Sequence, residues 1–442
     1  MADQGGAPAR LAAAKVLASV LKSKRTLDDT LATEPDYRAL DGSDRGFARA
    51  MVSAALRQLG RIDAVLMPLV NRPRGRVSVE VAAVLQIGAA QLWVLETAHH
   101  AAVSETVAAA KRWPVSAPAT GLINAVLRKA AEATDAFHAQ PASATWPNWL
   151  QADFKRSLGQ AAMERLAAVQ QDVPLLHLTA RGDAAALAAR VAGTVIAPGS
   201  VALAAGAVEA LPGFSEGEWW VQDAAAALAA RVLAPQAGET VFDLCAAPGG
   251  KTLQLADAGA DVIAVDRSKA RLKRLRENLA RTGLADRVEI VAAELESWSP
   301  AAKADAILLD APCSALGTLR RHPEGAWIKS REDVERFAGV QARLLAAAGQ
   351  WLKPGGRLVY CVCTPRAEEG RDIVDAACRD GGWQRDPIGE GVALGFAGSE
   401  TAAGDLLTVP KTVAGAALSD GPDGFQEVFD HDAFFVSRLR RA

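Results

Sequence analysis

The stretch ETVFDLCAAPGGKTLQLADAGADVIAVD, residues 239–266, decides the fold. A short apolar run ends in a turn with two glycines, a helical segment follows, and a second apolar run ends in Asp266. The chain then repeats this alternation, with further apolar runs in RVEIVAAE (287–294), ADAILLDAPCS (304–314) and GRLVYCVC (356–363). Strands that alternate with helices predict an α/β fold with a parallel, doubly wound sheet.

The turn AAPGGKT, residues 246–252, predicts a nucleotide-type ligand. It resembles the end of a phosphate-binding loop, but the pattern GxxxxGK[ST] requires glycine where this chain has Cys245, so the match fails. In a Rossmann-type site, Gly249 and Gly250 would let the backbone approach a ligand closely. Asp266 follows about 20 residues later, where a carboxylate can bind a ribose diol. We therefore expect an adenosine-type cofactor; the alternative is a tight connection without a ligand.

Two cysteines leave strands at the edge where such sheets bind ligands. Cys313 follows ILLDAP and Cys363 follows RLVYCV. A reduced cysteine is often only a small buried apolar residue, and this interpretation suits Cys378 and Cys245. Cys361 and Cys363 form a CxC pair, but the sequence supplies no second zinc-like pair, so we expect no metal site.

Thiols beside an adenosine cofactor suit the methylation of a pyrimidine. A thiolate that adds to carbon 6 makes carbon 5 enamine-like, so that carbon 5 can attack the methyl group of S-adenosylmethionine. Asp310, three residues before Cys313, is placed to hydrogen-bond the ring at N3 or to contact the cofactor. The proton at carbon 5 must then leave and the thiol must be expelled, a step that a second thiol can assist.

The N-terminal part of the chain has a different pattern. Apolar residues at helical spacing predict helices from residue 9 to about 140. Residues 1–145 contain 17 Lys and Arg against 13 Asp and Glu, and basic clusters at 22–25, 72–76 and 111–112 could contact phosphates or be solvated helix ends. A small section with short strands follows, and the chain ends in DAFFVSRLRR (432–441), which predicts a final antiparallel strand.

Composition limits the class of protein. A chain of 442 residues is long enough for about three domains. The formal charge of −2 argues against a uniformly basic nucleic-acid binder but not against a local basic face. Five cysteines do not make a disulfide scaffold in a chain of this length. The sequence shows neither a signal segment nor an apolar run of about 20 residues, so we expect a cytoplasmic protein that does not bind membranes.

Longer motifs carry a resemblance to a known family. DLCAAPGGKT (243–252), DAPCSALGTLRRHPE (310–324) and VYCVCTPRAEEG (359–370) resemble the motifs of the RNA 5-cytosine methyltransferases of the NOL1/NOP2/Sun superfamily. DRGFARAMVSAALRQ (44–58) and GLINAVLRKAAE (121–132) resemble the NusB-like RNA-binding domain. The combination is similar to bacterial enzymes that methylate small-subunit (16S) ribosomal RNA.

This resemblance implies three domains. They are an all-α NusB-like RNA-binding domain at 1–140, a small α+β linker domain at 141–220 and a Rossmann-like S-adenosylmethionine-dependent methyltransferase domain at 221–442. It implies a monomer that binds ribosomal RNA at an unstacked cytosine. Two alternatives remain: the same chemistry on transfer RNA, and a non-catalytic NusB-like RNA-binding factor. Intact Cys313, Cys363, Asp266 and Asp310 argue against the second.

The resemblance also implies roles for individual residues. The methionine and ribose end of the cofactor would lie against Cys245, Ala246, Ala247, Pro248, Gly249, Gly250 and Lys251. Asp266 would bind the ribose, and Asp310 would lie at the methyl-transfer centre. Glu294 stands where the family usually has Asp near the adenine, and its extra methylene still allows that contact.

Within the same resemblance, Cys363 matches the nucleophile and Cys313 matches the thiol needed for product release. The family's second motif usually reads Thr-Cys-Ser, whereas this chain has Val362-Cys363-Thr364 preceded by Cys361. Side chains two residues apart on a strand share a face, so the choice between Cys361 and Cys363 stays open at this point.

Positive charge near these motifs fits an RNA substrate. The segment 267–281 has seven Lys and Arg against one Glu, and Arg320, Arg321 and His322 follow the Cys313 motif. RNA phosphates could lie across both while the target base is unstacked into the site. A solvated helix face is the alternative for part of this charge.

Overall fold

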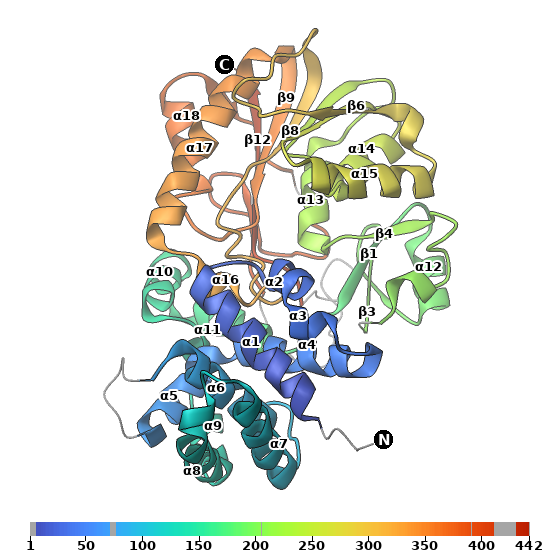
Figure 1. Ribbon diagram of the computed structural model, residues 1–442. Helices are drawn as coiled ribbons and strands as arrows, with labels where there is room; N and C mark the ends of the chain where they lie inside the picture. Colours follow the sequence, from blue (N-terminus) through green and yellow to red (C-terminus); the bar gives the residue numbers. More distant parts are fainter. Residues whose placement is uncertain (1–5, 71–76, 205, 390, 411–429, 442) are drawn as a thin grey trace. The chain divides into compact units, whose positions relative to one another are not determined.

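The computed structural model describes residues 6–70, 77–204, 206–389, 391–410 and 430–441 (Figure 1). The chain divides into two compact units. The helical unit contains residues 1–172 and 319–330, and the sheet unit contains residues 173–318 and 331–442. The basic cluster 72–76 and part of the C-terminal tail lie outside the described residues. The three-domain division stays a prediction.

The helical unit confirms the helices predicted from apolar spacing. Its elements are α1 (Ala7–Ser23), α2 (Leu27–Thr33), α3 (Pro35–Arg38), α4 (Gly42–Arg57), α5 (Leu59–Val70), α6 (Val79–Trp93), α7 (His99–Arg112), η1 (Ala117–Ala119), α8 (Thr120–Ala131), α9 (Thr134–His138), η2 (Ala142–Thr145), α10 (Asn148–Leu158), α11 (Gln160–Gln171) and α16 (Gly325–Ile328). Helix α1 packs against α4, α6 and α7 through a core rich in alanine, whose small side chains allow helices to approach closely.

The segment 319–330 follows the Cys313 motif in the chain yet packs within the helical unit. Its Glu324 is buried and accepts a hydrogen bond from the backbone N–H of Leu27 at 3.2 Å, at the start of α2. Lys24 donates to the carbonyl oxygen of Trp327 at 2.6 Å, and Ile328 packs against the alanine-rich core. The apolar pattern of the sequence did not predict this insertion.

The sheet unit begins with a small antiparallel sheet, which confirms the short strands expected after residue 173. Its strand order is β2-β3-β1-β4. The elements are β1 (Leu176–Ala180), α12 (Ala184–Val191), β2 (Thr194–Ala197), β3 (Ser200–Leu203), η3 (Val208–Ala210) and β4 (Trp219–Val221).

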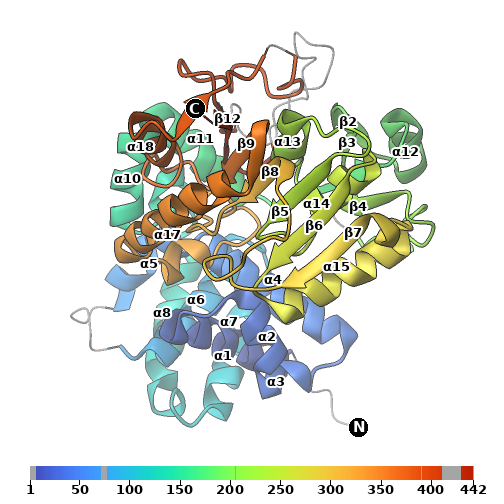
Figure 2. The ribbon, with the colours of Figure 1, turned by 90° about the horizontal axis from the view of Figure 1, so that it is seen from above.

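The larger sheet follows and has the strand order β10-β12-β9-β8-β5-β6-β7, with β11 paired to β12. Its strands are β5 (Thr240–Leu244), β6 (Asp261–Asp266), β7 (Val288–Ala292), β8 (Ala304–Asp310), β9 (Leu352–Val362), β10 (Trp383–Arg385), β11 (Leu406–Thr408) and β12 (Phe434–Arg441). The structure confirms that the five strands from β5 through β9 are parallel, as predicted. It also confirms the antiparallel last strand, β12, which pairs with β9. Figure 2 shows β9, β8, β5, β6 and β7 side by side.

Helices cover both faces of this sheet. They are α13 (Ala224–Leu233), α14 (Gly250–Asp257), α15 (Lys269–Thr282), the short η4 (Ala285–Arg287), α17 (Arg331–Gln350) and α18 (Arg371–Arg379). Alternate strand residues face opposite ways: Val241 packs with α13, α14 and α15, whereas Phe242 packs with α17 and α18. The chain order reverses between the neighbours β5 and β8, and a doubly wound sheet binds its ligand beside such a point.

Candidate active site

The glycine-rich turn connects β5 to α14 at the carboxyl edge of the sheet. Cys245 has a φ of +64°, a left-handed conformation that a residue with a Cβ adopts only under constraint. Two backbone hydrogen bonds hold the turn against the end of β6: Ala246 donates to the Val265 carbonyl at 3.1 Å, and Ala247 donates to Asp266 Oδ2 at 3.2 Å. The predicted cofactor loop therefore lies against the predicted ribose-binding carboxylate.

Gly249 is required where α15 approaches the turn. Its φ is +109°, and a Cβ there would lie 2.3 Å from Cδ1 of Leu275. Gly250 begins α14, and a Cβ added to it would come no closer than 3.2 Å to the Gln222 side chain. Position 249 therefore requires glycine both for its backbone conformation and because a Cβ would clash. Position 250 tolerates a Cβ more easily.

Asp266 ends β6 and is 2% exposed. It accepts from the backbone N–H of Ser268 at 2.7 Å, and Arg271 pairs with both carboxylate oxygens at 3.1 Å. The side chain is thus fixed at the carboxyl end of the strand. Glu294 lies just beyond β7 and is exposed, and the backbone N–H of its neighbour Ala293 donates to the Asp266 carbonyl at 3.2 Å.

An ion pair occupies the point between β5 and β8. Lys251 from the turn donates to Asp310 Oδ2, at the end of β8, at 2.8 Å. Burial alone would lower the pKa of Lys251, but the adjacent Asp310 carboxylate outweighs it and raises that pKa above its usual value. The amine therefore stays charged, and the turn is tied to β8.

Cys361 lies on the other side of the same carboxylate. Its Sγ is 3.6 Å from Asp310 Oδ1, and its side chain is fully buried. Burial, with the negative charge of Asp310, raises the pKa of the Cys361 thiol well above its ordinary value. Cys361 is therefore held as a neutral thiol that packs beside the site.

Cys313 and Cys363 meet although they are on different loops. Their Sγ atoms are 3.3 Å apart, and both residues are partly exposed. Contact with Cys363 and burial raise the pKa of Cys313 well above its ordinary value. Cys313 therefore stays protonated near neutral pH and can donate its S–H to the neighbouring sulfur. Both Cys361 and Cys363 pack against the same core, as strand alternation predicted.

A buried polar network holds the two cysteine loops together, and sequence reasoning missed it. Glu369 is fully buried and accepts from the backbone N–H of Ser314 at 2.7 Å and from its hydroxyl. Gln341 donates to the Pro312 carbonyl at 2.9 Å and to Glu369 at 3.2 Å. Burial raises the pKa of Glu369. The available signal was a short hydroxyl residue directly after each cysteine, Ser314 and Thr364, whose hydroxyls lie 3.4 Å apart.

Gly317 closes the same arrangement. Its N–H donates to the Cys363 carbonyl at 2.9 Å, and its carbonyl accepts from Ala433 at 3.0 Å. A Cβ at this position would lie 1.9 Å from the Ala433 oxygen, so only glycine lets the Cys313 loop approach the Cys363 loop this closely.

Asp243 lies beneath the turn on β5 and gives the fold a pH dependence. It is fully buried and accepts from the Thr252 hydroxyl at 2.6 Å, and burial raises its pKa from 3.8 to about 7. Lys251 opposes this shift, and the charges of Asp310 and Asp266 add to it. The folded state binds this proton more tightly than the unfolded state, so the stabilisation is complete below pH 4 and is lost as pH rises through 7.

We therefore expect Asp243→Asn to become relatively more stable than the wild-type protein at high pH. The difference between their free energies of unfolding should shift in favour of the variant by about 3 kcal/mol between pH 5 and pH 8. Urea denaturation of both proteins at the two pH values measures it. A difference that is the same at pH 5 and pH 8 would show that Asp243 does not titrate in this way.

The structure thus brings together at one sheet edge the residues 245–251, Asp266, Asp310, Cys313 and Cys363. Glu294 lies at the same edge, just beyond β7. In the described ranges, no group of three or more His, Cys, Asp or Glu side chains could hold a metal ion. Among the helices that are described, none combines the length and the apolar character needed to cross a membrane.

A family model described as 16S rRNA methyltransferase RsmB/F matches residues 230–399, and the NusB family model matches residues 7–132. A protein named ribosomal RNA small subunit methyltransferase B from Pseudomonas syringae pv. tomato is 36% identical over 391 residues, which cover 83% of this chain and 86% of the relative. One of the same name from Vibrio cholerae is 37% identical over 390 residues, covering 83% and 88%.

Solved structures share the fold. The protein titled PH0851 superposes with a TM-score of 0.71 at 20% identity and covers 100% of this chain and 99% of its own. NSun6 from Pyrococcus horikoshii, solved with SFG, gives a TM-score of 0.54 at 20% identity over 67% of this chain and 98% of its own.

Proposed function

Because the chain belongs to the ribosomal RNA small subunit methyltransferase B family, we propose that it methylates carbon 5 of one cytosine in 16S ribosomal RNA through a covalent cysteine adduct. Members of this family methylate ribosomal RNA, and the methyl donor is S-adenosylmethionine. The observation that carries the proposed attack at carbon 5 through a cysteine adduct is the pair of thiols, Cys313 and Cys363, whose sulfur atoms lie 3.3 Å apart at the carboxyl edge of the sheet.

The residues of the turn fit this cofactor. Gly249 lets Leu275 of α15 pack closely against the turn, and the Asp266 carboxylate faces the same turn. We propose that the ribose hydroxyls donate to Asp266 in place of its contacts with Arg271, which is half exposed, and that Glu294 contacts the adenine. S-adenosylmethionine, when bound, would supply the methyl group to carbon 5; its bond from sulfur to the methyl carbon breaks, and S-adenosylhomocysteine is the leaving group.

The protein's own residues perform the remaining steps of the proposal. The Cys363 thiolate adds to carbon 6 of the cytosine, which gives carbon 5 the electron pair that attacks the methyl carbon. N3 of the ring takes a proton from water as the thiolate adds and returns it to water when the sulfur leaves. Asp310, held by Lys251, accepts a hydrogen bond from the N3–H in between. The Asp310 side chain is 30% exposed, so a base that enters the site can reach it.

Release reverses the addition. The proton at carbon 5 leaves to water, its electron pair restores the double bond between carbons 5 and 6, and the bond from carbon 6 to sulfur breaks. Cys363 then departs as a thiolate. Cys313, which is protonated and 3.3 Å away, donates its S–H to that sulfur and so stabilises the leaving group.

The proposal is tested by following a labelled methyl group. The purified protein is incubated with labelled S-adenosylmethionine and either 16S ribosomal RNA or transfer RNA, and the nucleosides are separated after digestion. We expect the label in 5-methylcytidine from ribosomal RNA. Label in another nucleoside would contradict attack at carbon 5, and label only in transfer RNA would contradict the proposed substrate.

The glycine turn gives a separate prediction on cofactor binding. Gly249→Ala should weaken S-adenosylmethionine binding about tenfold or more, because it combines an unfavourable φ with a contact on Leu275. Gly259→Ala is the matched control, because Gly259 also has a positive φ (+87°) but lies between α14 and β6, at the other edge of the sheet; it should change affinity by less than about threefold, a difference of under 1 kcal/mol. Calorimetric titration measures both, and a thermal melt verifies folding.

The same titration with ATP distinguishes the two classes of nucleotide site. Cys245 replaces the glycine that a phosphate-binding loop needs, so we expect binding of S-adenosylmethionine and not of ATP. Equal affinities of the two alanine variants, or tight ATP binding alone, would contradict the assignment of this turn.

A further inference from the structure

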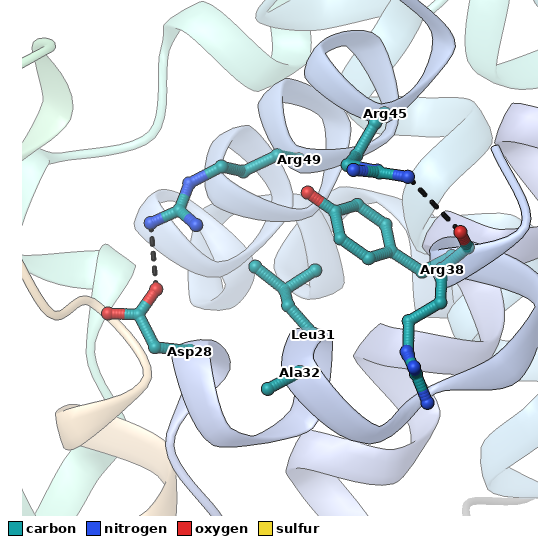
Figure 3. A pocket seen from close by; sticks show the side chains of 7 residues that line it. Asp28, Leu31, Ala32, Arg38, Arg45 and Arg49 are labelled. Carbon is teal, nitrogen blue, oxygen red and sulfur yellow. Dashed lines mark hydrogen bonds and ion pairs between the residues drawn. The ribbon is translucent and has the colours of Figure 1, made fainter. Parts of the chain in front are cut away.

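Charged side chains outside the reacting groups differ in how strongly water screens them. A pocket between α2, α3 and α4 (Figure 3) is lined by Asp28, Leu31, Ala32, Tyr37, Arg38, Arg45 and Arg49. Its Arg49 pairs with Asp28 at 2.8 Å, and both side chains are more than half exposed, so these charges act weakly on their surroundings. The Glu369 carboxylate is instead fully buried beside Ser314, the residue that follows Cys313. A buried charge acts more strongly on its neighbours, because little water screens it.

Glu369 links the two cysteine loops. Its Oε1 accepts from the backbone N–H of Ser314 at 2.7 Å, and its Oε2 accepts from the Ser314 hydroxyl. That hydroxyl lies 3.4 Å from the hydroxyl of Thr364, the residue after Cys363. The Tyr360 hydroxyl of β9 donates to the Glu369 carbonyl oxygen, so the strand that leads to Cys363 also holds the backbone that carries this carboxylate.

The contacts of Glu369 are those of an ionised carboxylate. The N–H and the hydroxyl of Ser314 and the amide of Gln341 all donate to it. Burial raises the pKa of Glu369, and these donors, together with the charge of Arg366, oppose that shift. A negative charge therefore lies buried next to the loop that carries Cys313.

This charge acts on the Cys313 thiol. Contact with Cys363 and burial raise the pKa of that thiol well above its ordinary value, and the charges of Glu369 and Asp310 add to the shift. Tyr360 is another titratable neighbour, but burial raises the pKa of its hydroxyl well above the ordinary value, so it stays neutral. A nearby negative charge disfavours the thiolate, so Glu369 favours the form of Cys313 that can donate a hydrogen bond.

The share of Glu369 in this effect grows in the covalent adduct. There the Cys363 sulfur is bonded to carbon 6 and carries no charge, so the largest cause of the raised pKa of Cys313 is gone. Asp310 pairs with Lys251 at 2.8 Å and, in the proposed reaction, accepts from the ring N3–H, which offsets its charge. Glu369 then remains as a carboxylate that keeps the proton on Cys313.

We propose that Glu369 is a positioning residue for product release, which holds Cys313 as the S–H donor to the departing Cys363 sulfur. Its hydrogen bonds to Ser314 aim the loop, and its charge disfavours loss of the Cys313 proton. The S–H bond of Cys313 stays intact in this step, and the bond that breaks is the one from carbon 6 to sulfur. The proposal rests on the proposed function, because release is a step of that reaction.

Glu369→Gln separates the charge from the hydrogen bonds. The glutamine Oε1 can still accept from the Ser314 N–H and from Gln341, and its amide can donate to the Ser314 hydroxyl oxygen. The variant therefore loses the negative charge and keeps the shape of the network. Asp372→Asn is the matched control, because it removes one carboxylate charge shortly after Glu369 in the chain, from an exposed pair with Arg371.

The first measurement follows the Cys313 thiol without methyl transfer. It uses a Cys363→Ala background, in which position 363 carries no charge, as in the adduct. Iodoacetamide reacts with the thiolate, and peptide mass spectrometry separates Cys313 from the other cysteines. Loss of the Glu369 charge should raise the thiolate fraction of Cys313 about tenfold at a given pH. A less basic thiolate is also less nucleophilic, so we expect alkylation about threefold faster in Glu369→Gln. The screened charge of Asp372 should change the rate by less than about 1.5-fold.

The second measurement is the pH dependence of release. The protein reacts with labelled 16S ribosomal RNA and S-adenosylmethionine from about pH 7 to about pH 9.5, and denaturing electrophoresis gives the fraction held as adduct. Glu369→Gln should release product as the wild-type protein does near neutral pH, but its adduct should accumulate at a pH about one unit lower. Ser314→Ala keeps the charge and the backbone hydrogen bond, so its adduct should not accumulate at a lower pH than in the wild-type protein.

Three outcomes would overturn the proposal. The first is a stall of Glu369→Gln that is equal at every pH, which would show that Glu369 only supports the loop. The second is an unchanged alkylation rate of Cys313, and the third is a shift in Ser314→Ala equal to that in Glu369→Gln. A thermal melt verifies that each variant folds.

The alkylation assay needs no RNA, which separates this proposal from the proposed function. If alkylation rises as expected while the methyl label appears in a nucleoside other than 5-methylcytidine, the proposed function fails and the action of Glu369 on Cys313 stands. If the label appears in 5-methylcytidine and alkylation does not change, only the role of Glu369 is contradicted.

Discussion

Replacing Cys363 by alanine should abolish methyl transfer. We expect a loss on the order of 10⁴-fold or more, as is found when a covalent nucleophile is removed, and no covalent complex with RNA. The physical reason is that carbon 5 of cytosine becomes nucleophilic only when a thiolate has added to carbon 6. Methyl incorporation from labelled S-adenosylmethionine measures the first effect. Denaturing electrophoresis of the protein with radiolabelled RNA measures the second.

Cys361→Ala is the matched control for this variant. Cys361 lies two residues earlier on the same strand, but it is fully buried and its thiol faces Asp310. Alanine there removes one sulfur from the core, and we expect most of the activity to remain. If Cys361→Ala is inactive while Cys363→Ala still forms adducts, the nucleophile has been assigned to the wrong thiol.

The sequence predicted the sheet and the edge on which the site lies, because these depend on short-range patterns. Apolar runs with helical segments between them predict parallel strands, and parallel strands carry their carboxyl ends to one edge. Asp266 ends β6, and Asp310 pairs in register with Cys361 on the neighbouring strand. The sequence therefore predicted that Cys313 and Cys363 lie at the same edge, and the observed register places their strands side by side.

The distance between the two sulfur atoms could not be predicted in this way. It depends on how two loops pack, and the packing uses Gly317, Ser314 and Glu369, which are far apart in the sequence. No periodic pattern marks a buried glutamate that accepts hydrogen bonds from a distant loop. The same holds for the segment 319–330, whose packing on α2 depends on Glu324 and Leu27.

The contact between the two sulfurs leads to the second large effect. Cys313→Ala should leave the addition to carbon 6 and the methyl transfer intact but should stall release. Without the S–H of Cys313, the departing Cys363 thiolate loses its hydrogen-bond donor. A lost hydrogen bond to a charged group is worth roughly 1.5–3 kcal/mol, so expulsion should slow by about 10- to 100-fold. Turnover should then fall to a small fraction of the wild-type rate while one methyl group per protein is still transferred.

The stalled species should be visible directly. Purified Cys313→Ala protein should retain RNA that survives denaturing electrophoresis as a band of lower mobility, and ribonuclease should remove the shift. The double variant Cys313→Ala with Cys363→Ala is the control and should carry no RNA, because it lacks the attacking sulfur. Ser314→Ala, beside Cys313 but directed toward Glu369, tests whether loosening the loop is enough to cause the stall. If the adduct accumulates in Cys363→Ala and vanishes in Cys313→Ala, the roles of the two thiols are exchanged. If neither variant forms an adduct, expulsion does not depend on the contact between them.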